Sequence, residues 1–495
     1  MDRRQFLKRA GTGLALAAAG CAAPRLDPPP RKPNIVLCMA DDQGWGDMAY
    51  NGHPLLETPH FDAMAAECVR FDRFYAAAPV CSPTRGSVLT GRHPNRFGCF
   101  KWGHTLRPQE ITIAEALKTA GYRTGHFGKW HLGSVRKGSP VNPGASGFDE
   151  WFSAPNFFDN DPILSREGKA VATSGESSAV TVDAALEFIG RRAAEPEPFL
   201  AVVWFGSPHN PHRAADEDGA HYAGQPDKVK NFLGEITGMD RAFGRLRNGL
   251  RTLGIADDTI LWYCSDNGGL PKLGATGGRG TKGKVYEGGL RVPALFEWPR
   301  RIAAPRTISA PCTTSDIYPT LLEIAGVRME AQPPLDGISL VPALEGLMEQ
   351  RPAPIGFWDY PDKGIGTPSH KWMTELLEAQ EAGHEPDDPD RLRLDAGVIA
   401  GDFPDDSFPG HAAWLDWPWK LHRIEKKDGA ARIELYHLVR DPMESQDLAN
   451  HDLGRAHDLG RAHELGRAHA MRSRLEEWLK SVVASINGAD YQEKE

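Results

Sequence analysis

The residues with the clearest chemical potential stand in one short stretch, Cys81-Ser82-Pro83-Thr84-Arg85. Proline is favoured in the first turn of a helix, a preceding serine can cap that helix, and Gly91 can end it a few turns later. We therefore expect Cys81 and Arg85 at the positive end of a short helix, a place that stabilises an anion. A cysteine there is either an activated nucleophile or an inert buried residue, and the stretch alone leaves both interpretations open.

Three short apolar runs each lead into residues that can bind a metal or transfer a proton. The runs span residues 34–40, 199–205 and 259–265, and they lead into Asp41-Asp42, Ser207-Pro208-His209 and Asp266-Asn267. Continuous apolar runs of this length predict strands buried on both faces of a parallel sheet. The amphipathic segments between them, such as the one that starts at Thr112, indicate an α/β domain with helices on both faces. In such a sheet, ligands bind beyond the carboxyl ends of the strands.

Four of these residues offer only oxygen as a ligand atom: Asp41, Asp42, Asp266 and Asn267. A donor set without His or Cys suits Ca²⁺ or Mg²⁺ and argues against zinc. Each acidic pair taken alone could equally cap a helix or lie in a solvated turn. Their coincidence at strand ends favours a metal site, and Asp47 nearby is expected to be structural.

Two further segments supply positive charge. Gly128-Lys129-Trp130-His131-Leu132-Gly133 places a lysine and a histidine two residues apart, and Lys282 and Lys284 open a glycine-rich segment that ends at Pro293. A single lysine of this kind is usually a surface residue. Beside a metal site, the same lysines could hold an anionic substrate in spite of the net charge of −9.

Taken together, these motifs resemble the formylglycine-dependent (type I) sulfatases, in particular the arylsulfatases and N-acetylgalactosamine-6-sulfatases of the alkaline-phosphatase-like superfamily. The resemblance rests on Cys-x-Pro-x-Arg followed by Leu89-Thr90-Gly91-Arg92, on Asp-Asp-x-Gly, Ser-Asp-Asn-Gly and Gly-Lys-Trp-His-Leu-Gly, and on Lys-Gly-x-x-x-Glu-Gly-Gly-x-Arg-x-Pro. It implies an α/β fold with a mostly parallel sheet flanked by helices. A smaller C-terminal domain would consist of an antiparallel sheet and a helix.

The resemblance also implies a mechanism. A maturing enzyme would convert Cys81 to formylglycine, one hydroxyl of the aldehyde hydrate would attack sulfur, and the second would regenerate the aldehyde. Ca²⁺, with Mg²⁺ as the alternative, would be held by Asp41, Asp42, Asp266, Asn267 and the residue at position 81. The sulfate would be surrounded by Arg85, Lys129, His131 and Lys282. His209 would protonate the leaving alcohol and His131 would act as the base of the second step.

The motifs leave the substrate open. The family resemblance, together with an N-terminal export signal, indicates a sulfated carbohydrate as substrate. The net charge of −9 gives no support to nucleic-acid binding. Two other functions remain: a phosphonate or phosphate-ester hydrolase with the same nucleophile, and a catalytically silent glycan-binding lipoprotein. The silent form is disfavoured because every expected catalytic position is occupied.

The N-terminal residues indicate an export signal rather than a part of the fold. Arg3-Arg4-Gln5-Phe6-Leu7-Lys8 is typical of a twin-arginine signal, and the apolar core that follows is too short for a permanent membrane span. Ala18-Ala19-Gly20-Cys21 resembles a bacterial lipobox, with simple cleavage as the alternative. We expect a signal over residues 1–21, a tether over 22–33, and the twin-arginine translocase as a partner. The protein would be lipid-anchored in the periplasm or at the cell surface.

The remaining sequence divides into a catalytic domain over residues 34–350, a polar region over 351–418 that could face the substrate, and a C-terminal subdomain over 419–495. Aromatic clusters at residues 357–361 and 414–419 either stack on sugar rings or pack between domains. The residue pattern from Met471 to Ile486 predicts a helix with one apolar face in a core.

The hexapeptide repeat and the cysteines lead to two further predictions. The hexapeptide repeated over residues 451–468 would turn a helix by about 240° per repeat, so its leucines cannot share a face. We therefore expect a surface tract there, with metal binding by its histidines as the less favoured alternative. The seven cysteines do not form a disulfide framework in a chain of this length, and Cys38 and Cys264 are expected in the core.

Overall fold

The three apolar runs form adjacent strands at the centre of a ten-stranded sheet. They are β1 (Asn34–Ala40), β8 (Phe199–Trp204) and β9 (Thr259–Ser265), and β1 lies between the other two and pairs with both in parallel. β4 (Arg123–Lys129) continues the parallel arrangement on the far side of β8. All four strands are almost completely buried. The prediction of a parallel sheet buried on both faces is therefore confirmed.

The computed structural model describes residues 32–302, 304–399, 403–449 and 459–491. The order of the large sheet is β12–β2–β11–β9–β1–β8–β4–β5–β6–β7. Its outer strands are β2 (Val69–Phe71), β5 (Glu150–Ala154), β6 (Ile163–Arg166), β7 (Lys169–Ala172), β11 (Ala294–Glu297) and β12 (Arg306–Ile308). β5 runs parallel to β4, whereas β11 is antiparallel to β9, and β5, β6 and β7 are antiparallel to one another in turn. The sheet is therefore mostly parallel, as expected.

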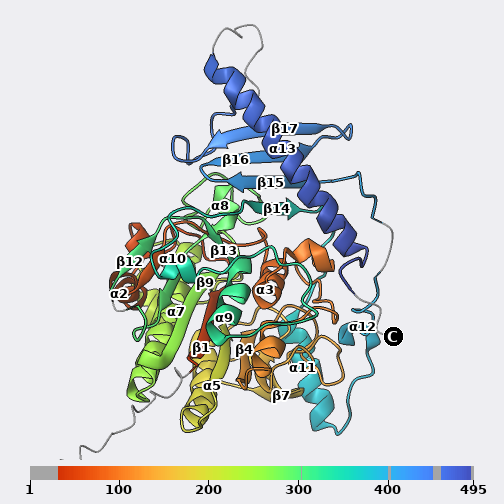
Figure 1. Ribbon diagram of the computed structural model, residues 1–495. Coiled ribbons are helices and arrows are strands. Elements are labelled where there is room, and N and C mark those ends of the chain that lie inside the picture. Colours follow the sequence, from red (N-terminus) through yellow and green to blue (C-terminus); the bar gives the residue numbers. More distant parts are fainter. Residues whose placement is uncertain (1–31, 303, 400–402, 450–458, 492–495) are drawn as a thin grey trace, which may run out of the picture. The chain divides into compact units, whose positions relative to one another are not determined.

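Helices cover both faces of this sheet because alternate side chains of each central strand enter two separate cores. From β1, Ile35 and Leu37 enter one core, whereas Val36 and Cys38 enter the other. The first core is closed by α3 (Cys81–Thr90), α4 (Ile113–Lys118) and α9 (Ile317–Ala325), and the second by α2 (Pro59–Glu67), α5 (Ser177–Arg192) and α7 (Asp227–Thr252) (Figure 1). The capping box predicted at Thr112 is present at the start of α4.

Helix α3 begins earlier than the sequence predicts. Its first residue is Cys81, so Pro83 stands at the third helical position and Ser82 does not cap. The Ser82 hydroxyl instead accepts a hydrogen bond from the backbone N–H of Gly103 at 2.9 Å. Gly91 ends the helix with a φ of 71°, as predicted. Every residue of α3 is buried, so tertiary contacts rather than a side-chain cap hold its first turn.

A second, antiparallel sheet forms the C-terminal part of the fold. Its order is β14 (Ile355–Asp359), β15 (His411–Asp416), β16 (Trp419–Glu425) and β17 (Ala431–His437). The expected boundary at residue 419 falls between two paired strands of this sheet. The long helix α13 (Leu459–Ile486) runs across it (Figure 1). The buried face of α13 carries the apolar residues predicted between positions 471 and 486, and this confirms their role in a core.

The aromatic clusters on either side of the polar region are part of this C-terminal core. Trp358 and Trp414 are buried among the side chains of the small sheet and α13, and Phe357 is buried on the other face of that sheet, beside Tyr75 and Val285. Packing is therefore their role, and stacking on a sugar ring is excluded for these three side chains.

The hexapeptide repeat is helical where the structure describes it. Residues 459–468 form the first turns of α13, a helix that the repeat did not predict, and residues 463–467 are exposed or half-buried, as expected for a surface tract. Residues 451–458 lie outside the described residues. The well-packed turns from Met471 onward nucleate the helix, and each residue added to a formed helix gains a hydrogen bond without a new nucleation cost. The gain from extending a formed helix therefore outweighs the low helix propensity of the glycines in the repeat.

The shorter elements complete the chain. A small sheet joins β3 (Phe74–Tyr75), β10 (Arg291–Val292) and β13 (Cys312–Thr313). The short helices are η1 (Ala49–Asn51), η2 (Pro94–Phe97), α6 (Asp216–Ala220), η3 (Ala256–Asp258), α8 (Glu287–Leu290), η4 (Thr314–Asp316), α10 (Val341–Leu344) and α12 (Pro389–Leu392), and α11 (Ser369–Glu381) is longer. The six cysteines within the described ranges are buried free thiols, and Cys38 and Cys264 lie in the two main cores as predicted.

Two predictions concern membranes and export. Of the helices that the structure describes, none has both the length and the apolar character needed to cross a membrane. The twin-arginine signal, the lipobox at Cys21 and the tether up to residue 31 lie outside the described residues.

Candidate active site

The carboxyl ends of four neighbouring parallel strands meet at one edge of the large sheet. β9, β1, β8 and β4 stand side by side in this order, and each ends at or leads into predicted functional residues. Helix α3 adds Cys81 and Arg85, and the loop before α8 adds Lys282. We call the resulting group the strand-end cluster: Asp41, Asp42, Cys81, Arg85, Lys129, His131, His209, Asp266, Asn267 and Lys282. The fold thus brings every site residue predicted from the sequence to one place.

Arg85 is completely buried at the centre of this cluster. Its Nη2 atom lies 2.6 Å from Asp266 Oδ2 and 3.6 Å from Asp41 Oδ1. Its Nη1 atom donates a hydrogen bond to the carbonyl oxygen of Lys129 at 3.2 Å. The guanidinium carbon also lies 5.2 Å from the ring centroid of Trp204, a neighbour that the sequence did not single out. One arginine therefore ties together the ends of all four strands.

Two lysines pair with the two aspartates that follow β1. Lys129 Nζ donates to Asp41 Oδ2 at 2.6 Å, and Lys282 Nζ lies 2.5 Å from Asp42 Oδ1. Burial alone would raise the pKa of Asp42, but the positive charges of Lys282, His209 and Lys129 outweigh burial and hold that pKa well below its usual range. Asp42 is therefore ionised at neutral pH.

Three oxygen atoms of the cluster are buried and have no hydrogen-bond partner within the described residues: Asp41 Oδ1, Asp42 Oδ2 and Asn267 Oδ1. Asn267 donates from Nδ2 to Asp42 Oδ1 at 2.9 Å, which leaves its amide oxygen unused. A buried polar atom without a partner costs about 1–3 kcal/mol, so three of them in one place call for a ligand. Oxygen donors of this kind fit Ca²⁺ or Mg²⁺.

The spacing of the donor atoms agrees with that fit. Ligand atoms of Asp41, Cys81 and Asp266 lie within 4.8 Å of one another, and so do those of Asp41, Asp42 and His209. Burial and the negative charge of Asp41 raise the pKa of Asp266 to about 6. A cation among these carboxylates would relieve their repulsion. The sequence did not predict that His209 would border the donor set, with Nε2 3.7 Å from Asp42 Oδ2.

Cys81 is buried inside this donor set. Burial raises the pKa of its thiol in spite of the nearby positive charges of Lys129 and Lys282. The thiolate, not the thiol, is the nucleophilic form of cysteine. The interpretation of Cys81 as an activated thiol is therefore disfavoured for the unmodified side chain.

His131 is buried, and neither of its ring nitrogens has a hydrogen-bond partner in the part of the chain that the structure describes. Burial, reinforced by the positive charges of Lys129 and Arg85, lowers its pKa well below the usual range. The ring is therefore neutral at pH 7 and has nitrogen lone-pair capacity for a proton or a substrate hydroxyl.

His209 is more open, with its side chain 21% exposed. Its ring stacks on Phe157 with 5.1 Å between ring centroids, and its Nδ1 donates a hydrogen bond to the carbonyl oxygen of Asn210 at 2.6 Å. Burial of the ring lowers the pKa of His209 to about 3, although the negative charge of Asp42 opposes this effect. An anionic substrate beside Nε2 would raise that pKa again.

Two cluster residues have a strained backbone. Asp42 has a φ of 71° and His131 a φ of 54°, both in the left-handed region that residues other than glycine rarely adopt. Such conformations cost about 1–3 kcal/mol each and concentrate at functional sites. Gly128, just before Lys129, serves a related purpose, since a Cβ atom there would stand 1.9 Å from the carbonyl oxygen of Trp204. Only glycine lets β4 approach β8 this closely.

A second group of buried charges joins the start of α8, the helix that follows the loop carrying Lys282, to the C-terminal sheet. We call it the C-terminal network: Glu287, Lys420, His422 and Glu444. Lys420 Nζ lies 2.9 Å from Glu287 Oε1 and 3.2 Å from Glu444 Oε1. Glu444 also accepts a hydrogen bond from the backbone N–H of Glu287 at 2.7 Å and pairs with His422 Nε2 at 2.8 Å. The sequence did not reveal this network, because its partners stand 133 and 157 residues apart.

The site gathers three cations, Arg85, Lys129 and Lys282, beside a buried potential nucleophile, and positive charge of this kind can stabilise an anionic ester during hydrolysis. The family model described as Sulfatase matches residues 33–327, and the chain belongs to this sulfatase family. Sulfatases are sulfuric ester hydrolases, so the predicted enzyme class is confirmed.

Known relatives and one solved structure agree with this assignment. N-acetylgalactosamine-6-sulfatase of Sus scrofa is 34% identical over 384 residues, which covers 68% of this chain and 70% of the relative. Arylsulfatase A of Homo sapiens is 31% identical over 389 residues, which covers 71% of this chain and 74% of the relative. The crystal structure of Ps i-CgsB in complex with k-i-k-neocarrahexaose has a TM-score of 0.73 at 24% identity and covers 91% of this chain and 93% of that one. The predicted family and fold are both confirmed.

Proposed function

We propose that this sulfatase hydrolyses sulfate esters of sulfated carbohydrates, with Cys81 converted to formylglycine and Ca²⁺ bound in the strand-end cluster. The observation that carries the proposal is the place of Cys81, within ligand distance of two buried carboxylates and beside Lys129 and Lys282. Sulfate-ester hydrolysis needs a nucleophile at sulfur and positive charge on the sulfate oxygens. The name of N-acetylgalactosamine-6-sulfatase describes action on a sulfated amino sugar, which supports a carbohydrate substrate.

The cation would be held by the oxygen atoms of Asp41, Asp42, Asp266 and Asn267, together with an oxygen of the modified residue 81. These include the three buried oxygens without a hydrogen-bond partner in the described chain. Bound Ca²⁺ supplies Lewis acidity at the reacting oxygens. Mg²⁺ suits the same donors and is the alternative cation.

The hydrate of formylglycine supplies two hydroxyls on one carbon, one for attack on sulfur and one for release of sulfate. Arg85, Lys129 and Lys282 hold the sulfate oxygens and neutralise the charge that develops on them. His209 gives a proton from Nε2 to the leaving alcohol, after the bound anion has raised its pKa. His131 takes up a proton in the release step, because its ring is neutral and its nitrogens are unengaged by the described residues.

Steady-state kinetics on nitrophenyl sulfate and on an aryl phosphodiester test the reaction class. The enzyme should be coexpressed with a formylglycine-generating maturing enzyme and loaded with Ca²⁺. We expect the larger kcat/KM for the sulfate, and turnover of at least one member of a panel of defined sulfated sugars. A larger kcat/KM for the phosphodiester would instead favour the phosphonate or phosphate-ester hydrolase, and sugar binding without turnover would favour the silent lipoprotein.

We also propose export through the twin-arginine translocase and a lipid anchor on Cys21. The twin-arginine pattern at Arg3-Arg4 and the lipobox-like residues before Cys21 support this. The twin-arginine route carries folded proteins, so Cys81 could be modified before export. Wild-type protein should partition into detergent and the Cys21→Ser variant into water. Partition of the wild type into water would rule out the anchor.

A further inference from the structure

A cavity of about 200 Å³ opens from the strand-end cluster at His131. Its lining also includes Ser134, Trp372, Arg391 and Arg393. Part of the lining, including Trp372, Arg391 and Arg393, comes from the segment between β14 and β15, which contains α11 and α12. Of the residues named here, only His131 takes part in the reaction proposed above.

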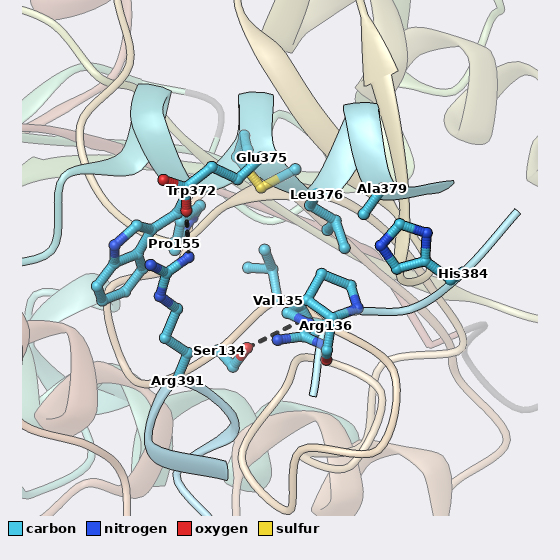
Figure 2. A pocket seen from close by; sticks show the side chains of 12 residues that line it. Ser134, Val135, Arg136, Pro155, Trp372, Glu375, Leu376, Ala379, His384 and Arg391 are labelled. Atoms are coloured by element: carbon cyan, nitrogen blue, oxygen red, sulfur yellow. Dashed lines mark hydrogen bonds and ion pairs between the residues drawn. The ribbon is translucent and has the colours of Figure 1, made fainter. Parts of the chain in front are cut away.

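A second cavity of about 260 Å³ adjoins the first. The two share Ser134, Pro155, Trp372 and Arg391 in their linings. Figure 2 shows Trp372 and Arg391 together on one side of the second cavity. Together the two cavities reach the range of about 300–1,000 Å³ that is typical of small-molecule sites.

Hydrogen bonds fasten the elements that form the walls of these cavities to the large domain. Gln380 of α11 accepts a hydrogen bond from the N–H of Ala170 at 2.8 Å and donates one to the carbonyl oxygen of Gly168 at 3.0 Å, which fastens α11 to the β6–β7 hairpin. Asn156 donates to the carbonyl oxygen of Thr367 at 3.0 Å, so the loop that carries Phe157 beside His209 is joined to the same wall. A rigid wall reduces the entropy lost when a ligand binds.

The charge of Arg391 is already neutralised. Its Nη1 lies 2.5 Å from Glu375 and its Nε 2.8 Å from Asp388, and its guanidinium carbon packs 5.0 Å from the ring centroid of Trp372. Arg391 therefore holds the indole in place, and an aromatic wall of this kind suits the apolar face of a sugar ring.

Arg393 differs from Arg391 because, within the described residues, its charge is paired only loosely. It forms a long ion pair with Asp395, with 4.0 Å between Nε and Oδ1, and its buried Nε has no hydrogen-bond partner among the residues that the structure describes. Its backbone is left-handed, with a φ of 56° at the end of α12. Asp390, the acid in the same lining, is an exposed residue. In the second cavity, Arg136 also has a buried Nε that no described residue contacts by a hydrogen bond.

We propose that the two joined cavities bind the saccharide beside the scissile sulfate, and that Arg393 pairs with a second anionic group on it. The inference rests on the proposed sulfatase function and deepens it, because it assigns the substrate to saccharides with more than one anionic group. An arginine fork recognises sulfate and carboxylate alike, so either group satisfies the geometry. Arg393 is in this view a specificity-determining residue, and His131 is the point where the saccharide pocket meets the catalytic cluster.

The test uses the Cys81→Ala protein, which lacks the proposed nucleophile and so should not turn the substrate over, with and without Arg393→Gln. Calorimetric titrations with a disulfated hexosamine should show binding about 10–100-fold weaker in the Arg393→Gln protein. The affinity for the monosulfated hexosamine should fall much less in the same variant. Arg393→Lys should recover part of the affinity for the disulfated sugar. A sulfated disaccharide with a uronate tells whether a carboxylate can replace the second sulfate. Arg440→Gln, which removes an equal charge from an exposed position after β17, is the matched control.

Equal weakening for both hexosamines, no weakening for either, or no binding of any of these sugars would overturn the pocket assignment. In active enzyme, Arg393→Gln should lower kcat/KM for the disulfated sugar more than for nitrophenyl sulfate. If the wild type hydrolyses no sulfate ester but binding still depends on Arg393, the proposed function fails and the pocket assignment stands.

Discussion

The strand-end cluster and the C-terminal network are both groups of buried charges, yet they differ in how far their polar atoms are satisfied. In the C-terminal network, no side-chain nitrogen or oxygen of Glu287, Lys420, His422 or Glu444 is among the buried atoms that lack a hydrogen-bond partner in the described chain. In the strand-end cluster, several atoms lack such a partner among the described residues: Asp41 Oδ1, Asp42 Oδ2, Asn267 Oδ1, Arg85 Nε and both ring nitrogens of His131.

This difference separates structural charge from functional charge. A saturated network gains hydrogen bonds from every group it buries, and it rigidifies the fold around it. Buried polar atoms without a hydrogen-bond partner destabilise the fold. Several of them in one place therefore indicate a site where a bound ligand supplies the missing partners. The left-handed backbone at Asp42 and His131 adds to the same conclusion, because strain of this kind also concentrates at functional sites.

Removal of the proposed nucleophile should have the largest effect. Cys81→Ala should lower kcat for nitrophenyl sulfate by at least about 10⁴-fold, because no other group in the cluster replaces a covalent nucleophile. The buried Cys312→Ala variant is the matched control and should keep its activity. Mass spectrometry of the Cys81 peptide should show formylglycine, and a fully active preparation that contains only the thiol would contradict the proposal.

The proposed acid role of His209 gives the next largest effect. A sugar hydroxyl leaves poorly without a proton, whereas nitrophenolate needs little help. His209→Ala should therefore lower kcat/KM for a sulfated sugar by about 10²–10⁴-fold, and for nitrophenyl sulfate far less. Lys129→Ala should damage both substrates alike, since it holds the sulfate itself. Equal losses on both substrates in the His209 variant would remove it from the acid role and make Lys282 the better proton donor.

A substitution in the C-terminal network should reduce the stability of the fold and leave the proposed metal binding of the strand-end cluster intact. Lys420→Met leaves the buried carboxylates of Glu287 and Glu444 without their cation, so the free energy of unfolding should fall by about 3–5 kcal/mol. Denaturant unfolding followed by circular dichroism measures this change. Lys426→Met, at an exposed position after β16, controls for the lost charge. A Lys420 variant as stable as the wild type would show that the network is not structural.

Asp336 is another carboxylate with hydrogen bonds to both oxygens, and it lies where η2 meets α13. It accepts hydrogen bonds from Arg96 Nε at 2.7 Å, from the N–H of His93 at 2.7 Å and from Trp478 Nε1 at 2.9 Å. Burial alone would raise its pKa, but Arg96 and these hydrogen bonds outweigh burial and lower the pKa from 3.8 to about 2.

Because the folded-state pKa of Asp336 is depressed, its contribution to stability is complete above about pH 4 and is lost as the pH falls through 2. This contribution is about 2 kcal/mol. The difference in unfolding free energy between wild type and Asp336→Asn should therefore shrink between pH 5 and pH 2 in urea titrations, two limits set by these pKa values. A difference that stays constant over that range would contradict the assigned ionisation.

The strand-end cluster could be predicted from the sequence because the patterns that indicate it are local. The apolar run before Asp41 predicts its strand, and the same holds for the run before Asp266. Since both strands are parallel neighbours, the residues that follow them meet. The short spacing from Cys81 to Arg85 likewise places both on one helix end, although α3 starts two residues before Pro83.

The C-terminal network, the pocket at His131 and the start of α13 depend on contacts between segments that are distant in the sequence. No local sequence pattern indicates such contacts. Lys420 reaches Glu287 only because β16 lies beside the start of α8, and Arg393 reaches the pocket at His131 only because α11 packs on β6 and β7 of the large sheet. The start of α13 inside the hexapeptide repeat also depends on tertiary packing, in this case of the turns after Met471.

Metal content measured by mass spectrometry on purified protein tests the distinction between the two clusters most directly. Wild type and Lys420→Met should both bind Ca²⁺ in stoichiometric amount, whereas Asp41→Asn should lose Ca²⁺ and sulfatase activity together. Chelation should inactivate the wild type, and added Ca²⁺ should restore it. Full activity without a divalent cation, unchanged Ca²⁺ in Asp41→Asn, or stoichiometric zinc in active protein would contradict the assignment of the strand-end cluster as an oxygen-donor metal site.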